Sequence, residues 1–195
     1  MNCTVTSELM RNLLSADIAS FETQLQTAQR GAQGIITVPY FNGERTPNLP
    51  YAKGSILGLD TQNVCSENII RSAVEGATFA LRFGLDELAQ LGVSAERIVL
   101  TGGGANSGAW RQIVADICNA PVIVLKNNEG AAFGAALQAL AMVEGADADL
   151  EKLVTEHLQT DPALLKEPDV TAVDVYNDVY ETYQRCAEKI AELYS

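Results

Sequence analysis

The segment that most constrains the fold is a short apolar run that leads directly into three consecutive glycines. Residues 98–101 (IVLT) are typical of a buried strand, and Gly102, Gly103 and Gly104 follow at once. Next comes a helical pattern that begins near Trp110. Glycines let the backbone turn tightly and let a bulky anion approach, and a helix start carries unpaired N–H groups and partial positive charge. The segment therefore predicts either a phosphate-binding turn or merely a tight turn.

Three well-known motifs do not fit this segment. Ser107 stands where a dinucleotide-binding G-x-G-x-x-G needs its last glycine, and the chain contains no Gly-Lys-Ser/Thr of a P-loop. A nucleophile elbow is excluded because Ser107 is flanked by Ala105 and Ala109 instead of glycines. We expect Asn106 or Ser107 to cap the helix. A dinucleotide-dependent oxidoreductase would need an acidic residue at the end of the next strand, but residues 125–126 there are Leu-Lys.

The rest of the chain alternates between helical and strand-like patterns. We expect strands at 35–41, 55–59, 97–101 and 121–125, and helices at 6–30, from Ser66 to Gly92, around 110–117, and at 130–143, 149–159 and 170–193. Such alternation predicts an α/β fold with a parallel or mixed sheet flanked by helices. We divide the chain into a lobe at 1–146 and an acidic helical extension at 147–195 that packs on it.

The composition excludes several classes of function. The chain has 195 residues and a net charge of −12, so nucleic acid and membrane surfaces are poor partners. No apolar run is long enough to span a membrane, and the first residues do not resemble a signal peptide. The four cysteines are widely spaced, which indicates free thiols in a reducing cytoplasm rather than a zinc site. The single histidine, His157, leaves little basis for a catalytic triad.

Two further segments carry candidate residues. Arg45, in the sequence GERTP at 43–47, could hold a phosphate or a carboxylate through its planar guanidinium, although an exposed loop is the simpler interpretation. Residues 127–136 (NNEGAAFGAA) are rich in small side chains, which favours close helix packing. Asp60, Asp86 and Asp116 have no evident partner, so none is assigned as a general base.

Several of these motifs together resemble the FGGY family of carbohydrate kinases. Residues 54–59 (GSILGL), Asn68-Ile69 and residues 72–75 (SAVE) match the second signature of that family. Residues 39–47 (PYFNGERTP) resemble its xylulokinase branch, and the glycine turn and residues 129–136 follow in the expected order. The resemblance covers about residues 2–145.

The resemblance implies the second lobe of the actin-like, ribonuclease H-like ATPase architecture, with extra C-terminal helices. It also implies ATP-dependent phosphorylation of a sugar or polyol with Mg²⁺, and D-xylulose is the substrate of the xylulokinase branch. The residues that it assigns to nucleotide binding are Gly102, Gly103, Gly104, Ala105, Ser107, Asn2, Thr4 and Glu129, with Arg45 as a substrate or phosphate candidate. Asn2 and Cys3 stand where some members have a glycine, and their side chains oppose a close backbone approach there.

The resemblance also implies what other parts of such a kinase supply. Family members have a first lobe with an Asp-x-Gly-Thr turn, the sugar site and the catalytic aspartate, and this sequence contains no Asp-x-Gly-Thr/Ser. We therefore expect a piece of a kinase, or one chain of a split one, which binds nucleotide weakly and phosphorylates nothing by itself. Alternatives are a non-catalytic nucleotide-binding or interaction module, and a kinase for gluconate, ribulose or glycerol. An exposed apolar face would favour a homodimer.

Overall fold

The computed structural model describes residues 2–126, 130–145 and 149–194. Its helices are α1 (Cys3–Leu13), α2 (Ile18–Thr27), α3 (Ser66–Gln90), α4 (Gly108–Cys118), α5 (Gly130–Glu144), α6 (Leu150–His157) and α7 (Val170–Glu192). The short 3₁₀ segments are η1 (Arg30–Gly34), η2 (Gly103–Asn106) and η3 (Pro162–Leu164). The strands are β1 (Ile36–Val38), β2 (Ser55–Leu57), β3 (Ile98–Leu100) and β4 (Val122–Val124).

The described strands form two separate pairs. β1 and β2 are antiparallel, with Ile36 opposite Leu57, while β3 and β4 are parallel, with Ile98 opposite Val122. The chain passes from β3 through η2 and α4 to β4, which is the strand–helix–strand unit that the sequence predicts. This unit places the glycine turn at the end of β3 and at the start of α4.

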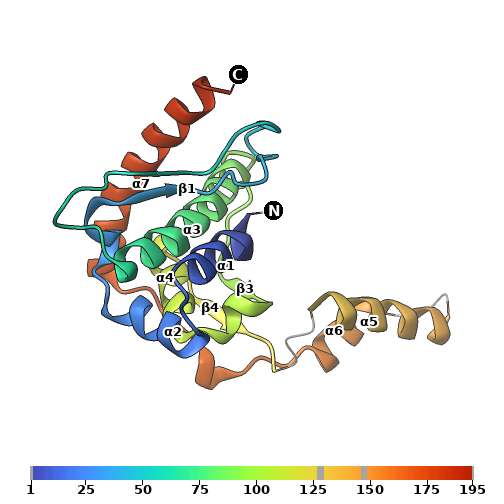
Figure 1. Cartoon of the computed structure of the whole chain (residues 1–195). Coiled ribbons are helices and arrows are strands. Elements are labelled where there is room, and N and C mark those ends of the chain that lie inside the picture. Colours follow the sequence, from blue (N-terminus) through green and yellow to red (C-terminus); the bar gives the residue numbers. More distant parts are fainter. Residues whose placement is uncertain (1, 127–129, 146–148, 195) are drawn as a thin grey trace.

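The long helix α3 lies at the centre of the molecule, against α1, α2, α4 and β1 (Figure 1). Its approach to β1 requires a glycine, because a Cβ at Gly76 would lie only 2.0 Å from the carbonyl oxygen of Thr37. Further along α3, Phe79 is 1 % exposed and packs against three tyrosines of α7, namely Tyr176, Tyr180 and Tyr183. The last helix therefore shares one core with α3 and α4.

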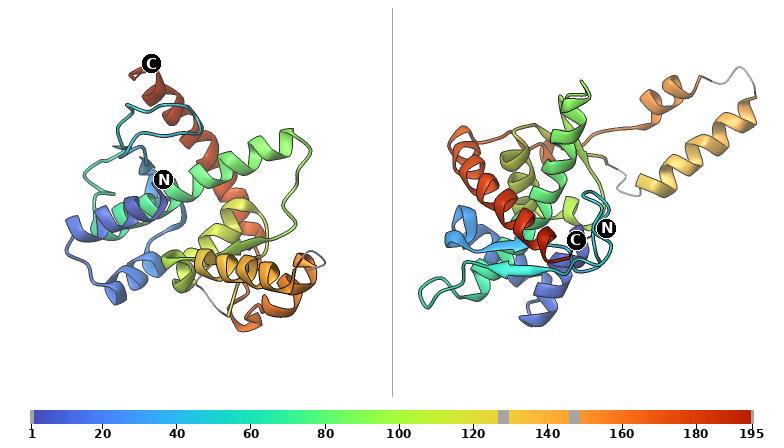
Figure 2. Two further views of the ribbon diagram at one scale, coloured as in Figure 1. Left: turned by 90° about the vertical axis from the view of Figure 1, so that its right-hand side faces the viewer. Right: turned by 90° about the horizontal axis from the view of Figure 1, so that it is seen from above.

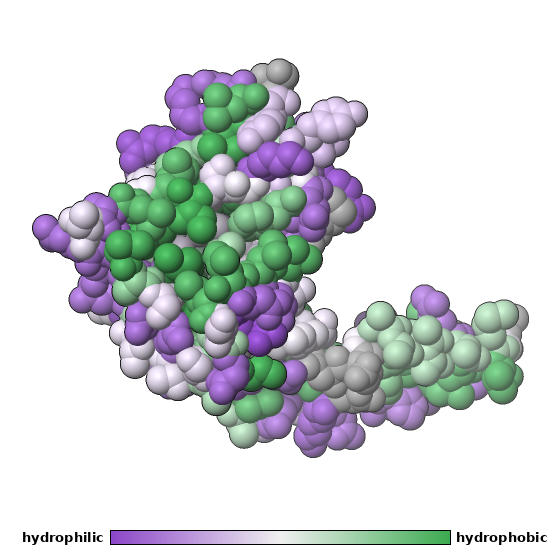
Figure 3. All heavy atoms as spheres, viewed as in Figure 1, coloured by the Kyte–Doolittle hydropathy of each residue, from purple (hydrophilic) through white to green (hydrophobic). Residues whose placement is uncertain are grey.

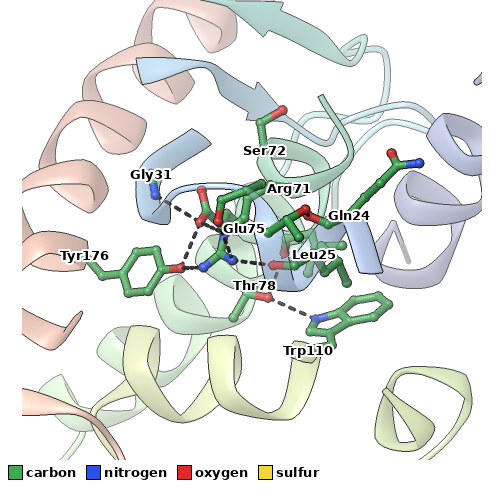
Figure 4. Close-up of polar contacts among 12 residues, drawn as sticks. Gln24, Leu25, Gly31, Arg71, Ser72, Glu75, Thr78, Trp110 and Tyr176 are labelled. Atoms are coloured by element: carbon green, nitrogen blue, oxygen red, sulfur yellow. Dashed lines mark hydrogen bonds and ion pairs between the residues drawn. The ribbon is translucent and has the colours of Figure 1, made fainter. Parts of the chain in front are cut away.

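A buried polar network also holds α7 to α3 (Figure 4). Arg71 and Glu75 form an ion pair of 2.7 Å on α3, and the hydroxyl of Tyr176 lies 2.6 Å from Arg71 and 2.8 Å from Glu75. The N–H of Gly31 donates to the same carboxylate. Burial raises the pKa of Glu75, an effect that Arg71 opposes, and burial also raises the pKa of Tyr176. Every member of the network has a partner, as buried charges require.

Helices α5 and α6 form an arm that extends away from the other elements (Figures 1 and 2). They pack against each other, and only Leu137 of the described residues of α5 is buried. Met142 and Val143 are each 84 % exposed, and Figure 3 shows apolar side chains along the arm and over part of the remaining surface. None of the described helices is both long and apolar enough to cross a membrane. The division at residue 146 stays a prediction.

The structure differs from the sequence predictions in α1 and α2, at the start of α3 and in the burial of β3. The helix predicted at 6–30 is wrong, because the chain breaks at Ser15, where φ is +54°, and α2 starts again with Asp17 as its N-cap. α3 has Cys65 at its N-cap position instead of Ser66. β3 is less buried than predicted, since Val99 is 47 % exposed.

Candidate functional site

The glycine turn is an open bend whose first two helical N–H groups face no acceptor in the part of the chain that the structure describes. Gly102 has a φ of +82°, a conformation that side chains rarely adopt, and its carbonyl accepts from the N–H of Ala105 at 3.1 Å. Gly103 and Gly104 begin η2, so their N–H groups precede any acceptor within the helix. Among the described residues, neither N–H has a hydrogen-bond partner. A Cβ at Gly103 would meet no atom within 4 Å, so this side of the bend is open.

At the start of α4, in contrast, the N–H groups of Ala109 and Trp110 are capped by side chains. The Ser107 hydroxyl accepts from the N–H of Trp110 at 3.0 Å and donates to the carboxylate of Glu22 on α2. The same carboxylate accepts from the N–H of Ala109 at 2.9 Å and from the side chain of Gln26. Glu22 thus takes the place of an external anion at the helix start. The prediction of unpaired N–H groups at this helix start is therefore wrong for Ala109 and Trp110. The unpaired N–H groups of the bend remain.

Two side chains of the first turns of α4 support the bend from the inside. The ring of Trp110 lies 3.2 Å from the position that a Cβ of Gly104 would take, and its indole N–H donates to Thr78 of α3 at 3.2 Å (Figure 4). The guanidinium of Arg111 donates to the carbonyl of Ala105 at 2.6 Å. These contacts fix the bend between a buried aromatic ring and a buried cation.

The outer side of the bend lines a hollow of about 630 Å³ that lies between it and the first two helices. Its other wall comes from α1 and α2, and its lining residues are Thr4, Ser7, Glu8, Arg11, Ile18, Ala19, Phe21, Glu22, Gly103, Gly104, Asn106, Ser107 and Trp110. Arg11 is engaged with Glu8 at 2.6 Å and with the carbonyl of Ala16 at 3.0 Å. A ligand in this hollow would meet the N–H groups of Gly103 and Gly104.

The structure brings together some of the predicted site residues but not all of them. Thr4 lines the same hollow as Gly103, Gly104 and Ser107, whereas Ala105 is buried behind the bend with 1 % exposed. Glu129 lies outside the described residues.

Asn2 and Arg45 lie at another loop. Asn2 is 3 % exposed and its side chain is engaged with Gly43, Glu44 and Asn42. Arg45 is exposed on that loop, whose next two residues line a separate apolar hollow of about 240 Å³ beside α7. Neither residue lines the hollow at the bend.

The described residues offer no cluster of three or more histidine, cysteine or acidic side chains that could hold a metal ion. A Mg²⁺ site built from protein ligands alone therefore does not fit this part of the chain. Mg²⁺ in nucleotide sites is held mainly by phosphate oxygens and water, with one or two carboxylates. Glu8 and Glu22 are the acidic residues that line the hollow, and both are engaged in other contacts.

Sequence reasoning missed two residues of the site. Glu22 gives no local signal, because the residues that it caps are 85 and 87 positions away. Arg111 lies within the recognised segment, but nothing in its sequence context distinguishes a buried side chain from an exposed one. Only the fold shows that its guanidinium lies behind the glycine bend.

Comparison with known proteins decides the family. The profile of the FGGY family of carbohydrate kinases, C-terminal domain, matches residues 5–143. The chain belongs to this family. A xylulose kinase of Haemophilus influenzae is 43 % identical over 183 residues, which cover 94 % of this chain and 37 % of that protein. This FGGY chain thus spans little more than a third of the length of that relative.

Solved structures agree with this assignment. A ligand-bound xylulose kinase from Lactobacillus acidophilus is 26 % identical and superimposes with a TM-score of 0.85, covering 99 % of this chain and 39 % of that one. A gluconate kinase from the same organism matches with a TM-score of 0.83 at 26 % identity, and it likewise covers 99 % of this chain and 39 % of that one. The expected architecture, that of FGGY sugar kinases with C-terminal helices, is confirmed.

Proposed function

We propose that this chain is the ATP-binding lobe of a sugar kinase that phosphorylates D-xylulose to D-xylulose 5-phosphate. The observation that carries the proposal is the pair of unpaired N–H groups at Gly103 and Gly104, which face a hollow large enough for a nucleotide. The family and the 43 % identity to a xylulose kinase support the reaction and the sugar.

In this proposal the residues of the chain bind and orient the nucleotide. The N–H groups of Gly103 and Gly104 donate to phosphate oxygens, and the absence of a side chain at Gly103 lets these oxygens come close. Thr4, on the opposite wall of the hollow, faces the same space. Ser107 does not serve as a direct ligand, because its hydroxyl is committed to Glu22 and Trp110.

The sugar site and the catalytic base belong to a first lobe in this proposal. The described residues of the hollow include no histidine, and its two acidic residues are already engaged. Phosphoryl transfer depends mainly on the positioning of the two reactants and on charge stabilisation, and positioning alone supplies about 7–11 kcal/mol. A lone lobe therefore binds nucleotide but does not accelerate transfer. Mg²⁺, when bound with ATP, neutralises phosphate charge, and we derive no step through it.

A second sugar is favoured by one observation. The gluconate kinase from Lactobacillus acidophilus matches this chain with the same 26 % identity as the xylulose kinase from that organism. Gluconate is accordingly the alternative substrate. We further propose a reducing, cytoplasmic location, which is supported by four cysteines that are all free. The exposed Met142 and Val143 of the arm support self-association, and sedimentation would detect it.

Calorimetric titration of the purified chain with ADP and ATP tests the binding proposal. We expect weak binding of both nucleotides and no ADP release with D-xylulose or gluconate. When a separately expressed first lobe of a xylulose kinase is added, we expect turnover with D-xylulose. Absence of nucleotide binding would contradict the proposal, and turnover by the lone chain would contradict the need for a first lobe.

A further inference from the structure

Arg111 is a buried cation that has little to compensate its charge. It is 7 % exposed, and its one hydrogen bond among the described residues runs from Nη1 to the carbonyl of Ala105 at 2.6 Å. Its Nε is buried and has no partner, and no described carboxylate lies within ion-pair distance of it. Arg71 is equally buried but has the carboxylate of Glu75 at 2.7 Å.

The position of Arg111 makes this arrangement costly for stability. It is the fourth residue of α4, where the helix dipole disfavours a positive charge. Buried polar atoms are nearly always hydrogen-bonded, and a buried charge without a partner is more costly still. A residue that served only to stabilise the fold would be better replaced by an apolar side chain of similar size. The arrangement therefore calls for a reason other than stability.

The contact with Ala105 gives that reason. Ala105 follows Gly103 and Gly104 directly, and its N–H already closes the turn onto the carbonyl of Gly102. The bond from Arg111 to its carbonyl holds the peptide unit on the other side of the same residue. With both sides held, the N–H groups of the two glycines keep one direction before any ligand arrives. Donors that are oriented in advance bind an anion without a cost of reordering.

We propose that Arg111 is a positioning residue for the nucleotide phosphates: it orders the glycine bend through the carbonyl of Ala105, and its unpaired charge attracts the phosphates on the far side of the bend. The inference rests on the proposed function and deepens it. Glu22 offsets the positive end of α4 at Ala109 and Ser107, while no described carboxylate offsets Arg111. The guanidinium lies behind the bend, with Nη1 on the carbonyl of Ala105 and Nη2 beside Gly108.

Three variants test the inference in the full chain. Arg111→Met removes both the charge and the hydrogen bond to Ala105. Arg111→Lys keeps the charge but lacks the planar guanidinium with its several N–H donors. Arg82→Met is the matched control, because Arg82 also donates to a carbonyl of α4, that of Ile117 at 3.0 Å, near the opposite end of the helix. Binding of ADP and of adenosine is measured for each, and amide hydrogen exchange at Ala105 and Ser107, whose N–H groups bond to the carbonyls of Gly102 and Gly104, reports the order of the bend.

We expect Arg111→Met to weaken ADP binding by about tenfold, as loss of a charge-assisted contact predicts, and to leave adenosine binding within about twofold. The ADP affinity of Arg111→Lys should lie between those of the wild type and of Arg111→Met. Arg82→Met should lower the melting temperature without changing the ratio of the two affinities. Exchange at Ala105 and Ser107 should accelerate in both Arg111 variants and not in the control.

Two results would overturn the inference. One is an unchanged ratio of ADP to adenosine affinity in Arg111→Met, and the other is unchanged exchange at the bend. If the wild-type chain binds no ADP, the proposed function fails together with the role of the charge. The exchange experiment needs no nucleotide, so it then still decides whether Arg111 orders the bend.

Discussion

The three adjacent glycines should respond differently to replacement by alanine, because each has different surroundings. At Gly102, with φ of +82°, alanine is strained and should lower the free energy of unfolding by about 1 kcal/mol. At Gly104 the new methyl would lie 3.2 Å from the ring of Trp110, and displacing that buried ring should cost about 1 kcal/mol. At Gly103 nothing lies within 4 Å, so stability should change by less than about 0.5 kcal/mol.

Across the three variants, the loss of ADP affinity should follow a different order from the loss of stability. The methyl of Gly103→Ala projects into the open space beside the two unpaired N–H groups, where a phosphate would lie. ADP affinity should therefore fall by about tenfold in this variant, which is equivalent to about 1.4 kcal/mol, although its stability is unchanged. Urea unfolding and calorimetric titration with ADP measure the two quantities separately. Gly92→Ala, at a distant glycine with φ of +83°, is the control that is strained but should bind normally.

The reasoning would be refuted if Gly103→Ala bound ADP as tightly as the wild type while both proteins melted at the same temperature. It would also be refuted if the loss of affinity across the three variants simply followed their loss of stability.

Three further predictions concern the capping and the buried contacts. Glu22→Gln should lower the free energy of unfolding by about 1–2 kcal/mol, because a charge-assisted cap of α4 is weakened, and thermal melts in low salt would show it. Tyr176→Phe should cost about 1–3 kcal/mol in urea unfolding, since Arg71 and Glu75 lose a buried partner. The pKa of Asp169 is lowered to about 2 by Thr171 and Arg30, so stability should fall as the pH drops from about 4 to 2, and Asp169→Asn should flatten that dependence.

Local sequence signals predicted much of the secondary structure. The strand-like segments at 98–101 and 121–125 form the parallel pair, and the intervening helix begins after Ser107, which caps it as one of the two predicted candidates. The apolar periodicity of α3 and α7 likewise gave their extents closely. These features depend on residues that are near one another in the chain.

Features that depend on distant residues were not predictable. The break between α1 and α2 requires a positive φ at Ser15, which helical periodicity conceals, although Asp17 is a possible N-cap in the sequence. The capping of α4 by Glu22 joins elements 85 residues apart. The incomplete burial of β3 depends on which elements cover it. Val99 is exposed, yet an apolar residue in a strand-like run is the same in the sequence whether it is buried or not.

The same distinction applies to the candidate site. The glycine bend was predicted from residue types, with a phosphate-binding turn as one of two interpretations, and the structure places Gly103 and Gly104 beside the hollow. The assignment of Asn2 came from the family resemblance, and its side chain is instead engaged with the loop at 42–44. Long-range hydrogen bonds of this kind arise only when the chain has folded.

The most direct test of nucleotide binding at the bend is a titration of the ¹⁵N-labelled chain with ADP, followed through its backbone amide resonances. The amides of Gly103 and Gly104 should show the largest shifts and saturate together, with smaller changes at Thr4. No shift at either glycine at millimolar ADP, or saturable shifts confined to the loop around Arg45, would contradict the account.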